Sequence, residues 1–143
     1  MGNKRIRALI ADDSEAVRRA VRDALEERPG IEVCATTGNG PETLAVALEL
    51  RPDIVILDVL MPGMNGLEVA KVLRKRQAKT KIILFTMFGD SIGTEVAAAA
   101  GVDIVLQKPD GLSKLIASLE GMLQKGRARA ATKPKRKAAH VGS

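Results

Sequence analysis

The chain has 143 residues, of which 45% are apolar, and this length and composition predict a single globular domain. One cysteine, Cys34, and one histidine, His140, cannot build an internal disulfide or a zinc site of Cys and His ligands, and two Phe without Trp or Tyr exclude a base-stacking platform. The net charge of +6 does not describe the body of the chain: seven of the 23 basic residues lie at Lys125 or later, which leaves 16 basic and all 17 acidic residues in 1–124.

Five short apolar runs alternate with stretches of helical period along the chain, at residues 6–11, 31–35, 54–57, 82–85 and 102–106. Several runs are apolar almost throughout, as strands buried on both faces are. Strands that alternate with helices predict repeated βαβ units and a parallel sheet. Right-handed crossovers then favour a doubly wound α/β fold of the flavodoxin-like kind, with five parallel strands in the order 2-1-3-4-5 and five helices covering both faces.

The helices between these runs have their own signals. Apolar residues repeat at spacings of three and four in 17–25 and again in 112–123, which predicts an amphipathic helix at each place. Asn65 is followed three residues later by Glu68, a pair that resembles the capping box at the start of a helix. A third helix is therefore expected to begin at Asn65.

Polar residues follow four of the predicted strands: Asp12-Asp13 after the first, Asp58 after the third, Thr86 after the fourth and Lys108 after the fifth. Open α/β sheets bind ligands beside the carboxyl ends of their strands, so we expect these side chains to meet at one edge. Three neighbouring carboxylates either retain protons or are neutralised by a hard cation, for which Mg²⁺ is the natural candidate and Ca²⁺ the second option.

With its charge masked by a cation, Asp58 could attack a phosphorus atom and form an aspartyl phosphate. Lys108 would offset charge on the phosphoryl oxygens, and Thr86 could donate a hydroxyl hydrogen bond to one of them. Because that bond exists only when phosphate is present, it could draw the segment after the fourth strand inward. Each residue alone has an ordinary explanation, such as a helix cap for Asp12-Asp13. Their occurrence together favours the phosphoryl site.

About residues 5–123 resemble the receiver domains of two-component response regulators, including the single-domain chemotaxis-type members. The likeness is carried by Asp12-Asp13, by the run DVLMPGMNG at 58–66, which is similar to the family's D-x-x-M-P-x-M-x-G segment, by Thr86 and by Lys108-Pro109. The resemblance implies that Asp58 is the phosphoacceptor, that Lys108 contacts the phosphoryl group and that Thr86 is the switch. It also implies a Mg²⁺ site formed by Asp12, Asp13, Asp58 and the Leu60 carbonyl, and a cis Lys108–Pro109 bond.

The resemblance further implies a role in phosphorelay signalling. Such a domain accepts its phosphoryl group from the phosphohistidine of a sensor histidine kinase or phosphotransfer protein. No second folded domain follows the receiver in this sequence, so we expect a single-domain regulator that signals to an unknown downstream protein through a face around residues 92–115. We expect a cytoplasmic protein without catalytic turnover and without membrane contact, because no stretch reaches the apolar length that a bilayer requires.

Two alternatives remain open. Val105 stands where many family members place a Tyr or Phe that takes part in switching, so the chain could be an interaction module that works without phosphorylation. A phosphohydrolase that uses Asp58 as nucleophile is disfavoured, because haloacid-dehalogenase-type enzymes normally need a second Asp two residues later, where this chain has Leu60.

The end of the chain has a different composition. Residues 125–143 contain seven basic residues, no acidic residue and one large aliphatic residue, Val141, so the segment cannot bury enough apolar surface to offset its ordering entropy. We predict a receiver domain in 1–124 and a disordered basic tail in 125–143. The tail is either a solvated charge run or a contact for polyanions whose affinity falls as salt rises.

Overall fold

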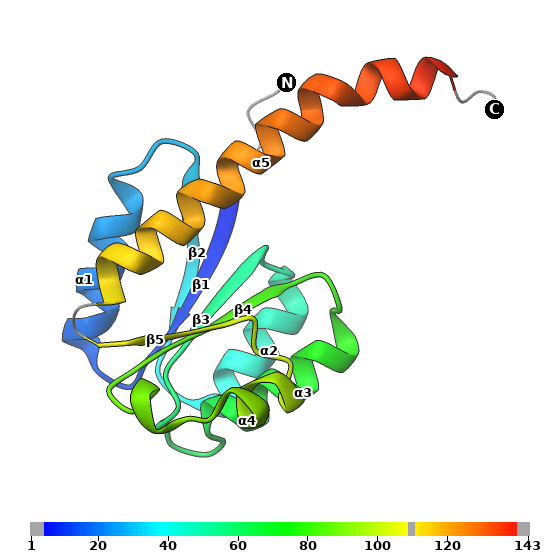
Figure 1. Cartoon of the computed structure of the whole chain (residues 1–143). Helices are drawn as coiled ribbons and strands as arrows, with labels where there is room; N and C mark the ends of the chain where they lie inside the picture. The colour runs from blue at the N-terminus through cyan, green and yellow to red at the C-terminus, as the bar shows by residue number, and fades with distance from the viewer. Residues whose placement is uncertain (1–4, 109–110, 140–143) are drawn as a thin grey trace.

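The computed structural model describes residues 5–108 and 111–139, without the side chains of 126–139. Strands and helices alternate along the chain (Figure 1). The strands are β1 (Ile6–Ala11), β2 (Ile31–Thr37), β3 (Ile54–Leu57), β4 (Lys81–Thr86) and β5 (Ile104–Gln107). The helices are α1 (Glu15–Glu26), α2 (Gly40–Leu50), α3 (Gly66–Arg76), α4 (Thr94–Ala99) and α5 (Gly111–Ala139), with a 3₁₀ turn, η1 (Gly89–Ser91), before α4.

The five strands form one parallel sheet in the order β2-β1-β3-β4-β5, which confirms the predicted topology. The bounds of β1 and β3 agree with the predicted runs, whereas β2 extends to Thr37 and β5 covers 104–107 rather than 102–106. Pairing sets these ends: Thr37 pairs with Ala11 of β1, and β5 begins to pair with β4 at Ile104. Ladder hydrogen bonds, rather than apolar content, therefore decide where a strand stops.

The sheet separates two hydrophobic clusters because successive side chains of a strand point to opposite faces. Figure 1 shows α1 and α5 on one face of the sheet and α2, α3 and α4 on the other. In β1, Ala8 and Ile10 belong to the cluster that includes residues of α1 and α5, while Leu9 and Ala11 belong to the cluster with residues of α2, α3 and α4. Both faces are thus covered, as the nearly continuous apolar strands require.

Local signals set the starts of three helices. Asn65 and Glu68 form the predicted capping box, with Asn65 Oδ1 accepting from the Glu68 amide and Glu68 Oε1 accepting from the Asn65 amide, each at 2.9 Å. Ser14 caps α1, and the Asn39 side chain caps α2. These caps supply partners for amide groups that have none inside the helix.

Helix α5 continues through Ala139 and so enters the segment for which the composition predicts disorder. In Figure 1 its second half projects beyond the sheet. Ala, Arg and Lys, which are frequent in this segment, have high helix propensity. Pro109 and residues 140–143 lie outside the described residues, and so does the predicted cis Lys108–Pro109 bond.

Candidate functional site

The carboxyl ends of two neighbouring strands bring together the acidic residues singled out in the sequence. Asp12 and Asp13 follow β1, and Asp58 follows β3, the neighbour of β1 in the sheet. One oxygen from each of these carboxylates lies within 4.8 Å of the others. Asp12 and Asp58 are buried, with exposed fractions of 3% and 8%, whereas Asp13 is exposed. Two of the three carboxylates are therefore shielded from solvent, and the third is accessible to it.

Lys108 supplies the cation of this cluster. It follows β5, and its Nζ lies 2.5 Å from Asp12 Oδ2 and 3.2 Å from Asp58 Oδ2. The lysine side chain is itself buried, so the attraction between these charges is weakly screened by water. Its Nζ also lies 5.7 Å from the centre of the Phe85 ring, within the range of a cation–π contact.

Backbone contacts position the two buried acidic residues. The Asp58 amide donates to the Ala11 carbonyl at 2.9 Å, which continues the β1–β3 pairing to the end of the strands. Asp12 Oδ1 accepts from the Ser14 amide at 2.9 Å, so the turn into α1 orients this carboxylate. Gly66 allows α3 to start directly behind Asp58, because a Cβ atom at Gly66 would lie 2.2 Å from the Asp58 carbonyl oxygen. These contacts fix the backbone of Asp58 and orient the carboxylate of Asp12.

Asp58 Oδ1 has no hydrogen-bond partner within the described residues although it is buried. Buried polar atoms are rarely left without a partner, so this oxygen is available to a ligand. An unpartnered carboxylate oxygen beside the Asp12 and Asp13 oxygens fits the ligand preference of Mg²⁺, a hard cation that takes few carboxylates and keeps several waters. The residues present therefore fit this ion.

Thr86 and Leu60 lie at the same end of the sheet. Thr86 ends β4, is completely buried, and its Oγ1 accepts a hydrogen bond from the Phe88 amide at 3.3 Å. The hydroxyl hydrogen of Thr86 is left to donate to another group. Leu60 lies two residues after Asp58, and its side chain is 55% exposed. The structure therefore brings oxygens of Asp12, Asp13 and Asp58 within 4.8 Å of one another and pairs Lys108 with Asp12 and Asp58. It places Thr86 at the adjacent strand end.

Sequence reasoning missed the side chain of Gln107. It hydrogen-bonds twice to the segment that follows Thr86: its Nε2 donates to the Met87 carbonyl at 2.7 Å, and its Oε1 accepts from the Asp90 amide at 2.8 Å. Nothing in a single glutamine at the end of a strand predicts these partners, which are 20 and 17 residues away along the chain.

Cys34 is not a candidate nucleophile. Burial raises the pKa of its thiol, and the sulfur donates to the Ala8 carbonyl across the sheet at 3.4 Å. A raised pKa lowers the fraction of reactive thiolate at neutral pH. Cys34 therefore packs as part of β2.

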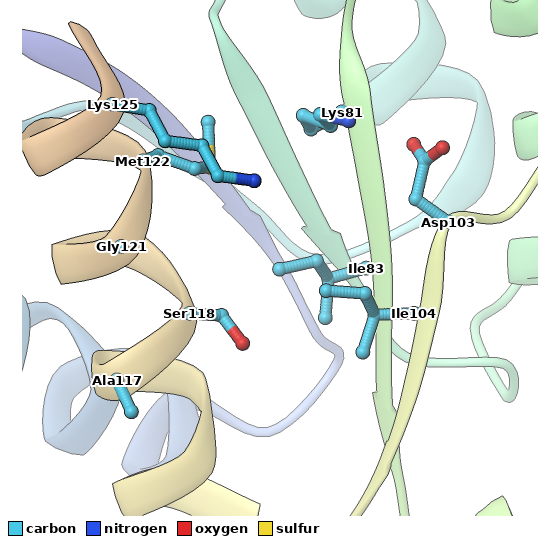
Figure 2. A pocket seen from close by; sticks show the side chains of 9 residues that line it. All are labelled: Lys81, Ile83, Asp103, Ile104, Ala117, Ser118, Gly121, Met122 and Lys125. Atoms are coloured by element: carbon cyan, nitrogen blue, oxygen red, sulfur yellow. The ribbon is translucent and has the colours of Figure 1, made fainter. Parts of the chain in front are cut away.

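Two hollows lie apart from the acidic cluster. A groove of about 430 Å³ runs between α4 and β5 and is lined by residues that include Ile92, Ala97 and Val105. A cavity of about 310 Å³ lies between α5 and the strands β4 and β5, where Figure 2 shows Met122 opposite Ile83 and Ile104. Neither hollow includes Asp12, Asp58 or Lys108 among its lining residues.

Within the described part of the chain, none of the helices combines the length and apolar character needed to cross a membrane.

Comparisons with known proteins agree with this fold. Residues 8–120 match the family model of the response regulator receiver domain. The chain is 36% identical over 117 residues to a protein-glutamate methylesterase/protein-glutamine glutaminase of Nocardioides sp., which covers 80% of this chain and 32% of that protein. It therefore spans about a third of that relative's length.

Solved structures give the same result. A LuxR-family two-component response regulator from Aurantimonas sp. SI85-9A1 has a TM-score of 0.75 at 28% identity and covers 85% of this chain and 87% of that one. The response regulator domain of Thermotoga maritima CheB has a TM-score of 0.73 at 26% identity, covering 85% and 96%. By its sheet order, its acidic cluster and its matched residues, the chain belongs to the family of response regulator receiver domains.

Proposed function

We propose that Asp58 accepts a phosphoryl group from the phosphohistidine of a sensor histidine kinase or phosphotransfer protein and that this modification switches a partner-binding face. The observation that carries the proposal is the unpartnered, buried Oδ1 of Asp58, which lies in a cluster with Asp12, Asp13 and Lys108. A carboxylate with an unpartnered oxygen can bind an ion or form a new bond without first losing a hydrogen bond. The oxygen that faces Lys108 is already paired.

In the proposed transfer, one carboxylate oxygen of Asp58 attacks phosphorus, so that a P–O bond forms as the P–N bond to the histidine breaks. The electron pair of the broken bond leaves with the imidazole nitrogen of the donor. Lys108 then has two functions: it holds Asp58 in place before transfer and offsets charge on the phosphoryl oxygens afterwards. The Thr86 hydroxyl donates a hydrogen bond to a phosphoryl oxygen.

Asp12, Asp13, Asp58 and the Leu60 carbonyl are the groups that would hold Mg²⁺. When bound, the ion neutralises the negative charge that carboxylates and phosphoryl oxygens concentrate in one place. Asp13 has the side chain most accessible to an ion that retains waters, because it is exposed while Asp12 and Asp58 are buried.

The proposed output face comprises α4, β5 and the start of α5, around residues 92–115. The groove between α4 and β5 lies on this face, and Val96 of α4 is 54% exposed. Such exposed apolar side chains beside a groove favour binding of a downstream protein. We expect the described residues to act as a regulator that is modified once per event, without catalytic turnover, in the cytoplasm.

The domain boundary and the basic segment belong to the same proposal. The matched family region ends at residue 120, which supports a receiver domain in 1–124 with an additional segment in 125–143. We propose that the seven basic residues of this segment contact a polyanion through charge.

Intact-mass spectrometry after incubation with acetyl phosphate tests the acceptor. The native chain is expected to gain about 80 Da in the presence of Mg²⁺ and to lose this gain when Mg²⁺ is chelated. Asp58→Asn removes the nucleophilic oxygen and should show no gain. Asp23→Asn, an exposed carboxylate of α1, is the matched control and should behave as the native chain does.

Each outcome separates the proposal from the alternatives. No added mass on the native chain, or equal added mass on Asp58→Asn, contradicts the assignment of the acceptor. Repeated release of phosphate from a phosphoester would instead indicate a hydrolase. Equal partner binding by native and Asp58→Asn chains under phosphorylating conditions would indicate an interaction module that does not use the modification.

A further inference from the structure

Residues 87–93 form the segment between β4 and α4, the β4–α4 loop. It connects Thr86 to the proposed output face and contains the turn η1. Thr86 itself is fixed, because its carbonyl accepts from the Lys108 amide at 2.9 Å as part of the β4–β5 pairing. Any movement that Thr86 transmits must therefore begin beyond its own backbone, in this loop.

The hydrogen bonds found between this loop and β5 in the described residues both come from Gln107. The amide nitrogen of its side chain donates to the Met87 carbonyl, and the amide oxygen accepts from the Asp90 backbone. A carboxamide is suited to this position because it has a donor and an acceptor on one planar group. Two other backbone bonds, from Ser91 to Phe88 and from Ile92 to Gly89, lie inside the loop. The Phe88 amide donates to Thr86 Oγ1, and the Gly93 carbonyl accepts from the Ala97 amide of α4, so neither of these bonds joins the loop to β5.

Gly89 is a second, independent sign of this contact. A Cβ atom at Gly89 would lie 2.9 Å from Gln107 Oε1 and 3.1 Å from Gln107 Cα. The loop can therefore lie against Gln107 because residue 89 has no side chain. Met87 and Phe88, which flank the held carbonyl, are 59% and 47% exposed, so apolar packing contributes little to holding this part of the loop.

We propose that Gln107 is a positioning residue that tethers the β4–α4 loop to β5 in the unphosphorylated chain and opposes movement of the loop toward a phosphoryl group on Asp58. The inference rests on the proposed function, because it assumes that Thr86 bonds to that group. In this proposal Gln107 controls switching in a chain that has Val105 at the position where many family members have an aromatic residue. Loss of the tether should make the switched state easier to reach.

Titration with beryllofluoride and Mg²⁺, followed by the amide NMR resonances of Thr86 and Asp90, tests the tether. Gln107→Met keeps the length of the side chain and removes both hydrogen bonds. Loss of two partly solvated hydrogen bonds costs the unswitched state on the order of one net hydrogen bond. The apparent affinity for beryllofluoride is therefore expected to rise about three- to tenfold. Exchange of the Asp90 amide with solvent should also become faster, since its acceptor is lost.

Two further variants test the tether in case Gln107→Met fails to fold. Gly89→Ala should push the Gln107 side chain away and so change the affinity in the same direction, and the double variant should show no further gain. Gln124→Met makes the same chemical change at an exposed position of α5 and should leave the titration unchanged.

The results distinguish the tether from the function on which it rests. A native chain that gives no response to beryllofluoride overturns the proposed function and the tether with it. A native chain that responds, with Gln107→Met unchanged or weaker, overturns the tether alone. A tighter response in Gln107→Met and Gly89→Ala, but not in Gln124→Met, supports it.

Discussion

Lys108 shows how strongly a single residue can determine the properties of the acidic cluster. Its ammonium group contacts Asp12 and Asp58 at once, and all three side chains are buried. Two buried carboxylates without a cation would be costly, so the lysine stabilises the chain before any metal binds. It also competes with a metal, because it pairs with the same carboxylates.

Replacing this lysine should reveal both effects. Lys108→Met is expected to lower the free energy of unfolding without Mg²⁺ by about 3–5 kcal/mol, since it removes one partner of a buried charge group. Added Mg²⁺ should then recover more stability in this variant than it adds to the native chain, because the freed carboxylates bind it more strongly. Urea unfolding with and without MgCl₂ measures the difference.

Lys71→Met, at an exposed position of α3, is the control for loss of one positive charge. An equal effect of Mg²⁺ on the native, Lys108→Met and Lys71→Met chains would contradict the competition between lysine and metal.

At the scale of an element, the start of α3 is the part on which the site depends most closely. The capping box of Asn65 and Glu68 fixes where the helix begins, and Gly66 brings its first turn against the Asp58 carbonyl. The Gly66 amide donates to the Val59 carbonyl at 2.8 Å, which holds the segment after Asp58 close to the helix. The helix start and the phosphoacceptor position are therefore one structural unit.

A methyl group at Gly66 should disturb this unit. Gly66→Ala is expected to lower the free energy of unfolding by about 1–3 kcal/mol through overpacking and to slow phosphorylation of Asp58 by acetyl phosphate. Gly121→Ala is the matched change, because a Cβ at Gly121 of α5 would meet no atom within 4 Å. There the loss of glycine flexibility should add about 0.5–1 kcal/mol of stability.

Urea unfolding measures the change in stability of both variants, and mass spectrometry measures the rate of phosphorylation. A Gly66→Ala chain as stable and as reactive as the native one would show that α3 can move away from Asp58 at no cost.

At the scale of the whole molecule, charge is divided between two parts. Residues 1–124 are close to neutral, because 16 of the 23 basic residues offset the 17 acidic ones, and the remaining basic residues follow in 125–143. The backbone of α5 carries this basic segment away from the sheet as far as Ala139 (Figure 1). A polyanion bound there would not need to contact the acidic cluster.

Duplex DNA of arbitrary sequence is the simplest polyanion with which to test this division. The full chain should bind it with an affinity that falls by about a thousandfold between 50 and 200 mM salt if most of the basic residues contact phosphates. A chain shortened to residues 1–124 should bind much more weakly and still take up the phosphoryl group at Asp58. Fluorescence anisotropy of labelled DNA measures the affinity.

Binding that is unchanged in the shortened chain, or insensitive to salt, would contradict a charge contact by the basic segment. No binding by either chain would favour the alternative that the segment is a solvated charge run.

The sequence alone determined the parallel sheet, the strand cores and the set of residues at the carboxyl ends of the strands, while the order 2-1-3-4-5 was expected as the common one for a doubly wound fold. This was possible because burial on both faces leaves an apolar run in each strand, and because chain direction in a parallel sheet fixes which end each following residue occupies. The capping box at Asn65 was equally predictable, since its two residues are three positions apart and act locally.

Only the tertiary structure decided which of these residues touch. Lys108 pairs with Asp12 across 96 positions and with Asp58 across 50, while Gln107 holds Met87 across 20. Such pairs depend on how β1, β3, β4 and β5 lie side by side, and on the length and direction of individual side chains.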